Sequence, residues 1–283
     1  HGMGEFSAVQ LADALKNNLD ATHIKGLCYI AKELPESAEE LPSYEDVAAD
    51  KDLFYSFFKA FYDNASAMTV KILVQKCGGR YLIQNPPYFP NSEELDKVYE
   101  LDYEREAHPY DAAQGQIKAV ETIRHSITTH RGCFGECNFC AITVHQGRSV
   151  ISRSEASIIR EAQAITRHKS FKGNITDVGG ATANMYGSEC ANMKQGNPCA
   201  DKRCLYPSVC PALNKSQKAY TELLQKLRKL KEIKLIRIAS GLRTDLEMAD
   251  KVNGKYFIAD LAKYHTGGQI KLAPEHADNA VLD

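Results

Sequence analysis

The sequence lacks a strong net charge and any long apolar run. Its 283 residues carry a formal net charge of -1, so there is no overall basic field to attract nucleic acid or anionic lipid, although a local basic patch is still allowed. No apolar stretch reaches the ~18 residues that a membrane-spanning helix needs. The first residues, HGMGEFSAVQLADAL, lack the basic and then apolar order of a secretion signal. We therefore expect a cytoplasmic protein with no membrane partner and no strong nucleic-acid signal.

Length and composition indicate an ordinary globular protein. Hydrophobic residues make up 43% of the sequence and charged residues 25%, which is typical of soluble domains. A chain of this length can bury a substantial core in one large domain, or in one and a half.

The sequence has nine cysteines, an odd number with uneven spacing. In a reducing compartment, such clusters indicate metal binding more often than disulfides. Cys28 and Cys77 stand alone, and we expect each to be a small buried hydrophobic residue. The other seven form two groups, which are Cys133, Cys137 and Cys140, and then Cys190, Cys199, Cys204 and Cys210.

The N-terminal part has the pattern of mixed α and β structure. Residues 1–25 read as a strand end that turns into an amphipathic helix, as at the end of a preceding Rossmann-like domain, and this predicts a fragment of a longer protein. Residues 26–125 are predicted to be an α+β linker region. It contains a helix over residues 44–65, whose aromatic face we expect in the core. The stretch TVKILVQKCGGRYLIQNPP predicts a β-hairpin.

From residue 126 to residue 283 the pattern alternates between strand and helix. Ser152 to Glu155 offers a capping box for one of these helices. Alternation of this kind predicts parallel β/α units, whose functional loops follow the carboxyl ends of the strands. Four strands end in HRGC, GGAT, SGLR and PEH, so we expect one site along one edge. A cysteine-rich insertion covers residues 186–214.

The first cysteine group has the spacing C-x3-C-x2-C and is one ligand short of four. Thiolates are the preferred ligands of iron–sulfur clusters, and Gly132 and Gly135 permit a tight loop. With three cysteines, a [4Fe–4S] cluster keeps one iron without a protein ligand, and an open position is typical of a catalytic metal site. The alternatives are a zinc site completed by His130 or His145, and an uncommitted cysteine cluster or a disulfide.

The stretch CFGECNFC places aromatic Phe139 before the last cysteine and resembles the radical S-adenosylmethionine (radical SAM) superfamily. The longer stretch SITTHRGCFGECNFCAITVHQGRSVISRSEASIIREA is similar to the YgiQ-type (UPF0313) family within it. QNPP, ELDKVYEL, CLYP, SGLRTDL and LAPEH fit the same family, so the resemblance covers nearly all of the chain.

This resemblance implies a fold and a reaction. The implied fold is α/β, with a partial (β/α) radical SAM barrel of parallel strands after an α+β N-terminal region. Cys133, Cys137 and Cys140 match the cluster ligands. In the superfamily, SAM binds the open iron and is reductively cleaved to methionine and a 5′-deoxyadenosyl radical, so the implied partners are SAM and an electron donor such as a flavodoxin or ferredoxin.

The resemblance also implies residues that contact SAM. Phe139 matches the aromatic position near the adenine, and Gly179-Gly180 matches the glycines that receive the amino group of the methionine moiety. The family's glutamate is replaced by Ala181, so only a backbone contact carries over there. A side-chain oxygen from Thr182 or Asn184 is a conjecture.

Further along the chain, Ser240 and Arg243 end the third strand, and Arg243 would meet the SAM carboxylate. Glu275 and His276 end the fourth strand, where relatives place polar groups against the ribose. The alternatives are a surface ion pair for Arg243, a capping pair for Glu275 and His276, and a mere tight turn for GGAT.

The second cysteine group has spacings of eight, four and five residues and matches no standard zinc finger. A second iron–sulfur cluster or zinc site, disulfides that brace the loop, and thiols near the substrate are the three interpretations.

A second class of function is a non-catalytic iron–sulfur or zinc module for redox or for partner or nucleic-acid binding. The neutral charge and the lack of a basic and aromatic stripe argue against nucleic acid. A redox protein without SAM leaves the glycine-rich strand ends unexplained. Relatives often carry a cobalamin-binding-like domain, but D-x-H-x-x-G is missing here. No feature of the sequence identifies the substrate.

Overall fold

A computed structural model of the chain describes residues 1–64, 70–199, 203–272, 278 and 280. The chain folds into two compact units, and neither is continuous in sequence. Unit 1 comprises residues 1–90, 134–149 and 195–202, and unit 2 comprises residues 91–133, 150–194 and 203–283, in each case as far as described. The division falls inside the first cysteine group, between Cys133 and Phe134.

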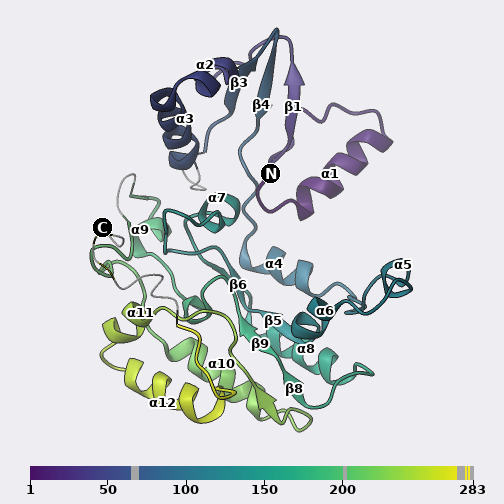
Figure 1. Ribbon diagram of the computed structural model, residues 1–283, viewed down its shortest axis with the longest axis vertical. Helices are drawn as coiled ribbons and strands as arrows, with labels where there is room; N and C mark the ends of the chain where they lie inside the picture. The colour runs from purple at the N-terminus through teal and green to yellow at the C-terminus, as the bar shows by residue number, and fades with distance from the viewer. Residues whose placement is uncertain (65–69, 200–202, 273–277, 279, 281–283) are drawn as a thin grey trace. The chain divides into compact units, whose positions relative to one another are not determined.

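Unit 1 contains a four-stranded sheet in the order β1-β4-β3-β2 (Figure 1). Its strands are β1 (Cys28–Ala31), β2 (Glu39–Leu41), β3 (Leu73–Cys77) and β4 (Arg80–Gln84). The predicted hairpin is confirmed, because β3 and β4 pair antiparallel on either side of Gly78-Gly79. Val74 lies opposite Ile83, and both side chains are fully buried.

The helices of unit 1 are α1 (Glu5–Lys16), α2 (Tyr44–Ala49), α3 (Lys51–Asp63) and α7 (Ile142–Gln146). The single helix predicted over residues 44–65 is therefore wrong in one respect: it is divided at Asp50. The backbone of Asp50 is extended, and its side chain accepts hydrogen bonds from the amides of Asp52 and Leu53. Asp50 thus ends α2 and caps α3, which is the behaviour expected of a short acidic side chain at a helix start.

The aromatic face of α3 does not lie in a core. Phe54 is 54% exposed and Phe58 is 43% exposed, and no residue of α3 is buried. The expectation of core packing is therefore wrong for this helix, since the 3.6-residue period indicates which side is apolar but not whether anything covers it. Cys28 is also exposed, contrary to expectation, because it lies on an outer strand of the sheet.

Unit 2 is built on short parallel strands. They are β5 (Ser126–Thr128), β8 (Asn174–Ile175), β9 (Asp177–Gly179) and β10 (Leu235–Ile236). β5 pairs with β9 and β8 pairs with β10, and a parallel bridge joins Leu242 to Leu272. The predicted parallel strand pairs are confirmed, and the described residues form no closed barrel.

Three helices cover these strands, namely α8 (Glu155–Thr166), α10 (Lys218–Arg228) and α12 (Gly254–Tyr264) (Figure 1). The core consists of their apolar faces packed on the strand side chains. Its members include Ile127, Ile158, Ile165, Ile175, Val178, Tyr220, Leu223, Leu227, Ile236, Phe257 and Leu261. Each such side chain contributes roughly 1.5–3 kcal/mol by leaving water, so this core holds the strand ends in place.

The remaining elements of unit 2 are α4 (Ser92–Tyr99), α5 (Pro109–Ala112), α6 (Lys118–Ile123), β6 (His130–Arg131), β7 (Ile151–Ser152), the 3-10 helix η1 (Ala183–Met185), α9 (Ala191–Lys194) and α11 (Thr244–Ala249). β6 and β7 pair antiparallel. The predicted capping box is misplaced by two residues. Ser154, not Ser152, caps α8 by accepting the amide of Ser157, because Ser152 is held in β7.

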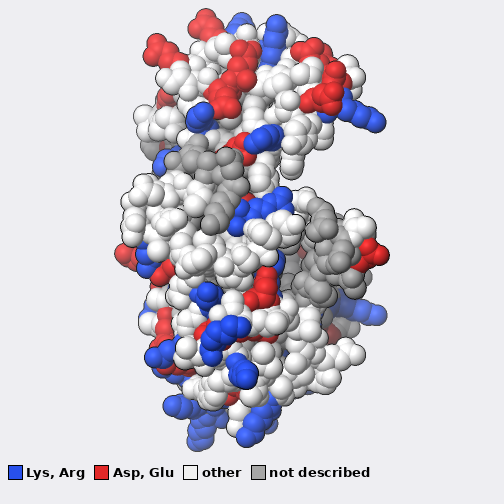
Figure 2. Space-filling view, turned by 90° about the vertical axis from the view of Figure 1, so that its left-hand side faces the viewer, with Lys and Arg blue, Asp and Glu red and all other residues white. Residues whose placement is uncertain are grey.

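The fold is a mixed α/β structure. None of the helices in the described part of the chain has the length and apolar character that a membrane-spanning helix needs. Figure 2 shows cationic and anionic side chains distributed over the face drawn, in keeping with the net charge of -1.

Candidate functional site

The strand ends of unit 2 converge at the carboxyl edge of the parallel strands. Thr129, directly after β5, donates its amide (2.7 Å) and its hydroxyl (3.1 Å) to the carbonyl oxygen of Gly179 at the end of β9. Ala183 donates its amide to the carbonyl oxygen of Gly241 at 2.9 Å. The structure therefore brings the HRGC, GGAT and SGLR strand ends together, as the sequence predicts. Glu275 and His276 of the PEH strand end lie outside the described residues.

Gly179 and Gly180 have no room for a side chain. A Cβ on Gly179 would lie 2.7 Å from Oγ of Ser240, and a Cβ on Gly180 would lie 2.8 Å from Nε2 of His130. Real contacts of this kind are much longer, so both positions require glycine for packing. At this glycine pair, the end of β9 thus packs closely against the two other strand ends, at Ser240 and at His130.

Asp177 of β9 organises the loop after β10, and the sequence analysis missed it. Its Oδ1 accepts the amides of Ala239 (2.8 Å) and Ser240 (3.1 Å), and its Oδ2 accepts the hydroxyl of Ser240. The hydroxyl proton of Ser240 is therefore committed to Asp177. Any contact from Ser240 to a ligand would use its lone pairs.

Asn184 and Arg243 are tied to each other by their backbone and side-chain groups. The side chain of Asn184 donates to the carbonyl oxygen of Arg243 and accepts its amide, both at 2.9 Å. The guanidinium of Arg243 donates from Nε to both carboxylate oxygens of Asp245 at 3.1 Å. Arg243 thus forms an ion pair at the start of α11, and the amide of Asn184 serves as a brace between two loops.

His130 is buried at the centre of this edge. It is 1% exposed, its Nδ1 lies 2.8 Å from the hydroxyl of Thr129, and burial lowers its pKa to about 4. Its Nε2 makes no hydrogen bond of ordinary geometry within the described residues, and only the Thr182 backbone is near enough to favour its protonation. A neutral imidazole at this place packs against Gly180.

Cys133 lies beside the loop that follows β9. Its Sγ is 3.6 Å from the hydroxyl oxygen of Thr182, and Thr182 is 9% exposed. Ala181, which directly follows the glycine pair, is exposed. The first cysteine of the loop and the glycine pair therefore belong to one local structure within unit 2.

Cys137 and Cys140 belong to unit 1 and occupy one turn. The amide of Cys140 donates to the carbonyl oxygen of Cys137 at 2.9 Å, and Phe139 between them is 71% exposed. Glu136 adopts a left-handed conformation, with a φ of 48°. Its buried carboxylate is bound by Arg148 at 2.8 Å and Tyr62 at 3.2 Å.

Glu136, Arg148 and Tyr62 were missed by the sequence analysis. An ion pair between residues twelve positions apart on one loop has no periodic signature, and a tyrosine contributed by α3 is visible only in the fold. Together they hold the middle of the cysteine loop to unit 1.

Within the described ranges, no group of three or more His, Cys, Asp or Glu side chains is placed to hold a metal ion. The fit of an iron–sulfur cluster therefore depends on the donor set. Three thiols, each partly exposed, lie on one loop, and Gly132 at φ 82° permits its tight path. Partly exposed thiols are accessible to iron, and thiolates are its usual ligands in such clusters. The residues present fit the group.

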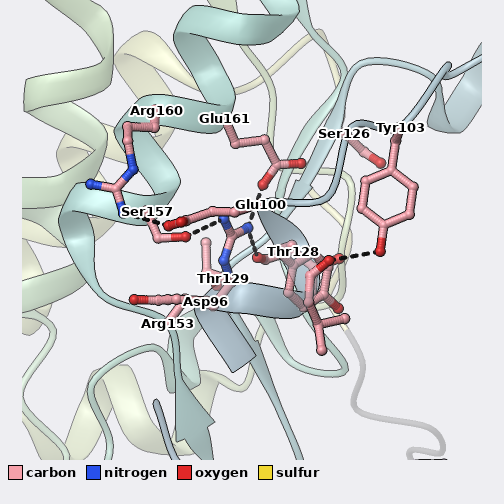
Figure 3. A network of polar contacts seen from close by, with 12 residues as sticks. Asp96, Glu100, Tyr103, Ser126, Thr128, Thr129, Arg153, Ser157, Arg160 and Glu161 are labelled. Atoms are coloured by element: carbon pink, nitrogen blue, oxygen red, sulfur yellow. Dashed lines mark hydrogen bonds and ion pairs between the residues drawn. The ribbon is translucent and has the colours of Figure 1, made fainter. Parts of the chain in front are cut away.

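A buried polar network supports the strand that leads into the cysteine loop (Figure 3). Arg153, which is 1% exposed, donates to the carbonyl oxygen of Thr128 at 2.8 Å, to Ser157 at 2.8 Å and to the carboxylate of Glu161. Arg105 donates to the other oxygen of Glu161. The network clamps β5 against α8 and fixes the start of the loop.

The second cysteine group is split between the units, with Cys199 in unit 1 and the other three in unit 2. Cys190 and Cys210 are buried. The amide of Cys210 donates to the carbonyl oxygen of Cys204 at 2.8 Å. Among the described residues, none of these four cysteines is joined in a disulfide.

Comparison with known proteins gives two results. Residues 1–126 match the family model described as radical SAM N-terminal. The whole chain is 49% identical to a UPF0313 protein of Fusobacterium nucleatum, 44% identical to one of Clostridium perfringens and 42% identical to one of Thermotoga neapolitana. It covers 50%, 43% and 50% of these relatives, respectively.

The chain thus spans about half the length of the curated relatives it matches. The match to the Fusobacterium nucleatum protein extends over all 283 residues of the chain. The chain is therefore similar over its full length to UPF0313 proteins, and its first 126 residues match the radical SAM N-terminal family model.

Proposed function

We propose that the chain forms the cluster-binding part of a radical SAM enzyme. Cys133, Cys137 and Cys140 would hold a [4Fe–4S] cluster and leave one iron open for SAM. The observation that carries the proposal is the position of Cys133, whose Sγ lies 3.6 Å from Thr182, two residues after the glycine pair. The first thiol ligand and the loop expected to receive the methionine moiety are therefore neighbours.

The bound cluster would supply the electron that cleaves SAM to methionine and a 5′-deoxyadenosyl radical, which then takes hydrogen from a substrate. The chain's own residues would bind and orient SAM. The carbonyl of Gly179 already accepts two hydrogen bonds from Thr129. The amino group of SAM would therefore be received by the carbonyl of Gly180 or Ala181, since the usual glutamate is replaced.

Other contacts to SAM are also proposed. Phe139 is exposed on the cysteine turn and would cover the adenine. Arg243 would have to exchange its ion pair with Asp245 for the SAM carboxylate, which is sterically simple because its side chain is 25% exposed. Ser240 would offer its lone pairs, and Glu275 and His276 would contact the ribose.

The parallel pairs β5/β9 and β8/β10, with the bridge from Leu242 to Leu272, support the proposal that unit 2 is part of a (β/α) radical SAM barrel. The electron donor would be a flavodoxin or ferredoxin in the cytoplasm. The second cysteine group stays a proposal for a further iron–sulfur cluster or zinc site.

The test is anaerobic reconstitution of the cluster followed by reduction and addition of SAM. We expect four irons per chain, a change in the electron paramagnetic resonance spectrum on SAM binding, and formation of 5′-deoxyadenosine. A four-iron cluster whose spectrum does not change on addition of SAM would refute the proposal. Bound zinc without iron would instead favour a non-catalytic module.

The Cys137→Ala variant tests the ligand assignment. It removes one of three thiolate ligands, so we expect loss of the visible absorption of the cluster and of nearly all its iron. Cys77→Ala, which changes a half-buried cysteine outside both groups, is the matched control and should keep its iron. Full iron content in Cys137→Ala would refute the assignment, and any iron or zinc bound reproducibly after this change would be assigned to the second cysteine group.

A further inference from the structure

Thr182 places a hydroxyl group against the first cysteine of the loop. Its Oγ1 lies 3.6 Å from Sγ of Cys133, which is within the range of hydrogen bonds to sulfur. Both residues belong to unit 2, and Thr182 is 9% exposed. The hydroxyl side of the contact is therefore shielded from water, where a hydrogen bond has more electrostatic effect, while Cys133 is partly exposed.

The backbone fixes the position of this hydroxyl on both sides. The carbonyl oxygen of Thr182 accepts the amide of Met185 at 3.1 Å, and the next residue, Ala183, donates its amide to Gly241 at 2.9 Å. A β-branched side chain also has restricted χ1 freedom. The hydroxyl is thus held in one place by the same strand ends that form the site.

The direction of the hydrogen bond follows from chemistry. A cysteine that ligates iron is a thiolate, which carries no proton and can only accept. The hydroxyl of Thr182 must then be the donor. A donor that faces a ligand sulfur stabilises negative charge on the cluster, and hydrogen bonds to the sulfurs are among the factors that set the reduction potentials of iron–sulfur clusters.

We infer that Thr182 is a positioning residue that raises the reduction potential of the cluster through its hydrogen bond to Cys133. This inference rests on the proposed function. Reduction adds one electron, supplied by dithionite through redox mediators, to the cluster. The added negative charge strengthens the hydrogen bond from Thr182, so the reduced state gains more from it than the oxidised state does.

The experiment is a redox titration of the reconstituted full chain, followed by electron paramagnetic resonance. Thr182→Val removes the hydroxyl and keeps the shape, and Thr182→Ser keeps the hydroxyl. Thr221→Val, in which a buried hydroxyl on α10 that donates to Gln217 is removed, is the control. We expect Thr182→Val to lower the equilibrium constant for reduction by roughly threefold to tenfold, where tenfold corresponds to 59 mV for one electron.

Thr182→Ser should stay close to the wild type, and Thr221→Val should leave the potential unchanged. An unchanged potential in Thr182→Val, or an equal shift in Thr182→Ser, would overturn the inference. If Thr182→Val takes up no iron, the titration is repeated with Thr182→Ala, which also lacks the hydroxyl. Loss of iron in both variants would show that the residue only holds the loop, against the inference. Failure of the proposed function is distinguishable, because it would be seen in the wild-type chain as a missing four-iron cluster or a missing response to SAM.

Discussion

At the strand ends of unit 2, the residue type at single positions is determined by close contacts as much as by chemical function. Gly180 touches His130, Thr182 faces Cys133, and Asp177 holds Ser240. The two members of each pair are at least 49 positions apart in the sequence. Such partners are set by the packing of the strands, so the chemistry of the site depends on single atoms at their ends.

Gly180→Ala should destabilise unit 2, because the new Cβ would lie 2.8 Å from the imidazole of His130 and 2.9 Å from its carbonyl oxygen. Overpacking of this kind costs about 1–3 kcal/mol. The check is urea unfolding of the cluster-free protein. Gly79→Ala is the matched control, since no atom lies within 4 Å of a Cβ there. Equal stability of the two variants would contradict the packing argument.

At the scale of elements, α11 and α12 approach each other closely, and the carboxyl group of Glu247 in α11 is buried. A Cβ on Gly254, at the start of α12, would lie 2.0 Å from the carbonyl oxygen of Glu247 in α11. Glu247 is 5% exposed, and its Oε1 makes no hydrogen bond within the described residues. Burial, with the nearby charge of Asp245, raises the pKa of Glu247 to about 7 from an ordinary value of 4.5.

This raised pKa gives stability a definite pH dependence. The unfolded chain releases the Glu247 proton near pH 4.5, whereas the folded chain keeps it until about pH 7. The contribution to stability is therefore fully present below pH 4.5, falls as the pH rises, and is lost above pH 7. The pKa of His130 is lowered to about 4, which acts in the opposite direction, so the comparison must be made with a variant of Glu247 itself.

Glu247→Gln removes the titration. We expect the wild type to lose about 1–3 kcal/mol more than the variant in the free energy of unfolding between pH 5 and pH 8. Urea unfolding at both pH values measures the difference. Glu222→Gln, on the exposed side of α10, is the control and should follow the wild type. A parallel pH profile for Glu247→Gln and the wild type would refute the assignment.

On the scale of the whole molecule, each of the two units buries apolar side chains of its own among the described residues. In unit 1 the fully buried Val74 and Ile83 pack between strands, and in unit 2 the helices α8, α10 and α12 pack on the parallel strands. Separate cores permit separate unfolding transitions, since two-state behaviour is a property of single domains. The chain crosses between the units within the cysteine loop.

Ile83→Ala should therefore lower the midpoint temperature of the unfolding transition of unit 1, and Leu227→Ala that of unit 2. Both side chains are 0% exposed, one in each unit, and each truncation should cost about 2–5 kcal/mol in its own unit. Calorimetry of the cluster-free protein would show which transition moves. A single unfolding transition whose midpoint temperature falls equally in both variants would show that the two units unfold together, against the prediction.

Much of the organisation was predictable from sequence, and the successes share a physical basis. The β-hairpin was predicted from two β-rich runs around Gly78-Gly79, and the alternation of strands and helices after residue 126 from the pattern of the chain. Local turn chemistry and helical period are properties of short segments. Parallel strand pairing in general was predicted, because alternating strands and helices have few other arrangements, and the fold shows that β5 pairs with β9.

The errors arose where distant contacts decide. Asp50 divides the predicted helix over residues 44–65, and the aromatic side chains of α3 are left exposed. Neither outcome is encoded in the apolar period. The partners of Asn184 and Ser240 were also missed, because each is bound by a residue from a different segment. An ion pair of Arg243 was among the stated alternatives, but its partner Asp245 was not named.

The sequence by itself indicated the family resemblance, the three-cysteine motif, the parallel β/α pattern and the glycine-rich strand ends, because these depend on residue type and short spacing. The tertiary structure alone decided which atoms meet: Thr182 with Cys133, Gly180 with His130, and Arg153 with the strand that enters the loop. The physical reason is that hydrogen bonds and close packing act over a few ångströms, and only the folded chain brings residues fifty positions apart within that distance.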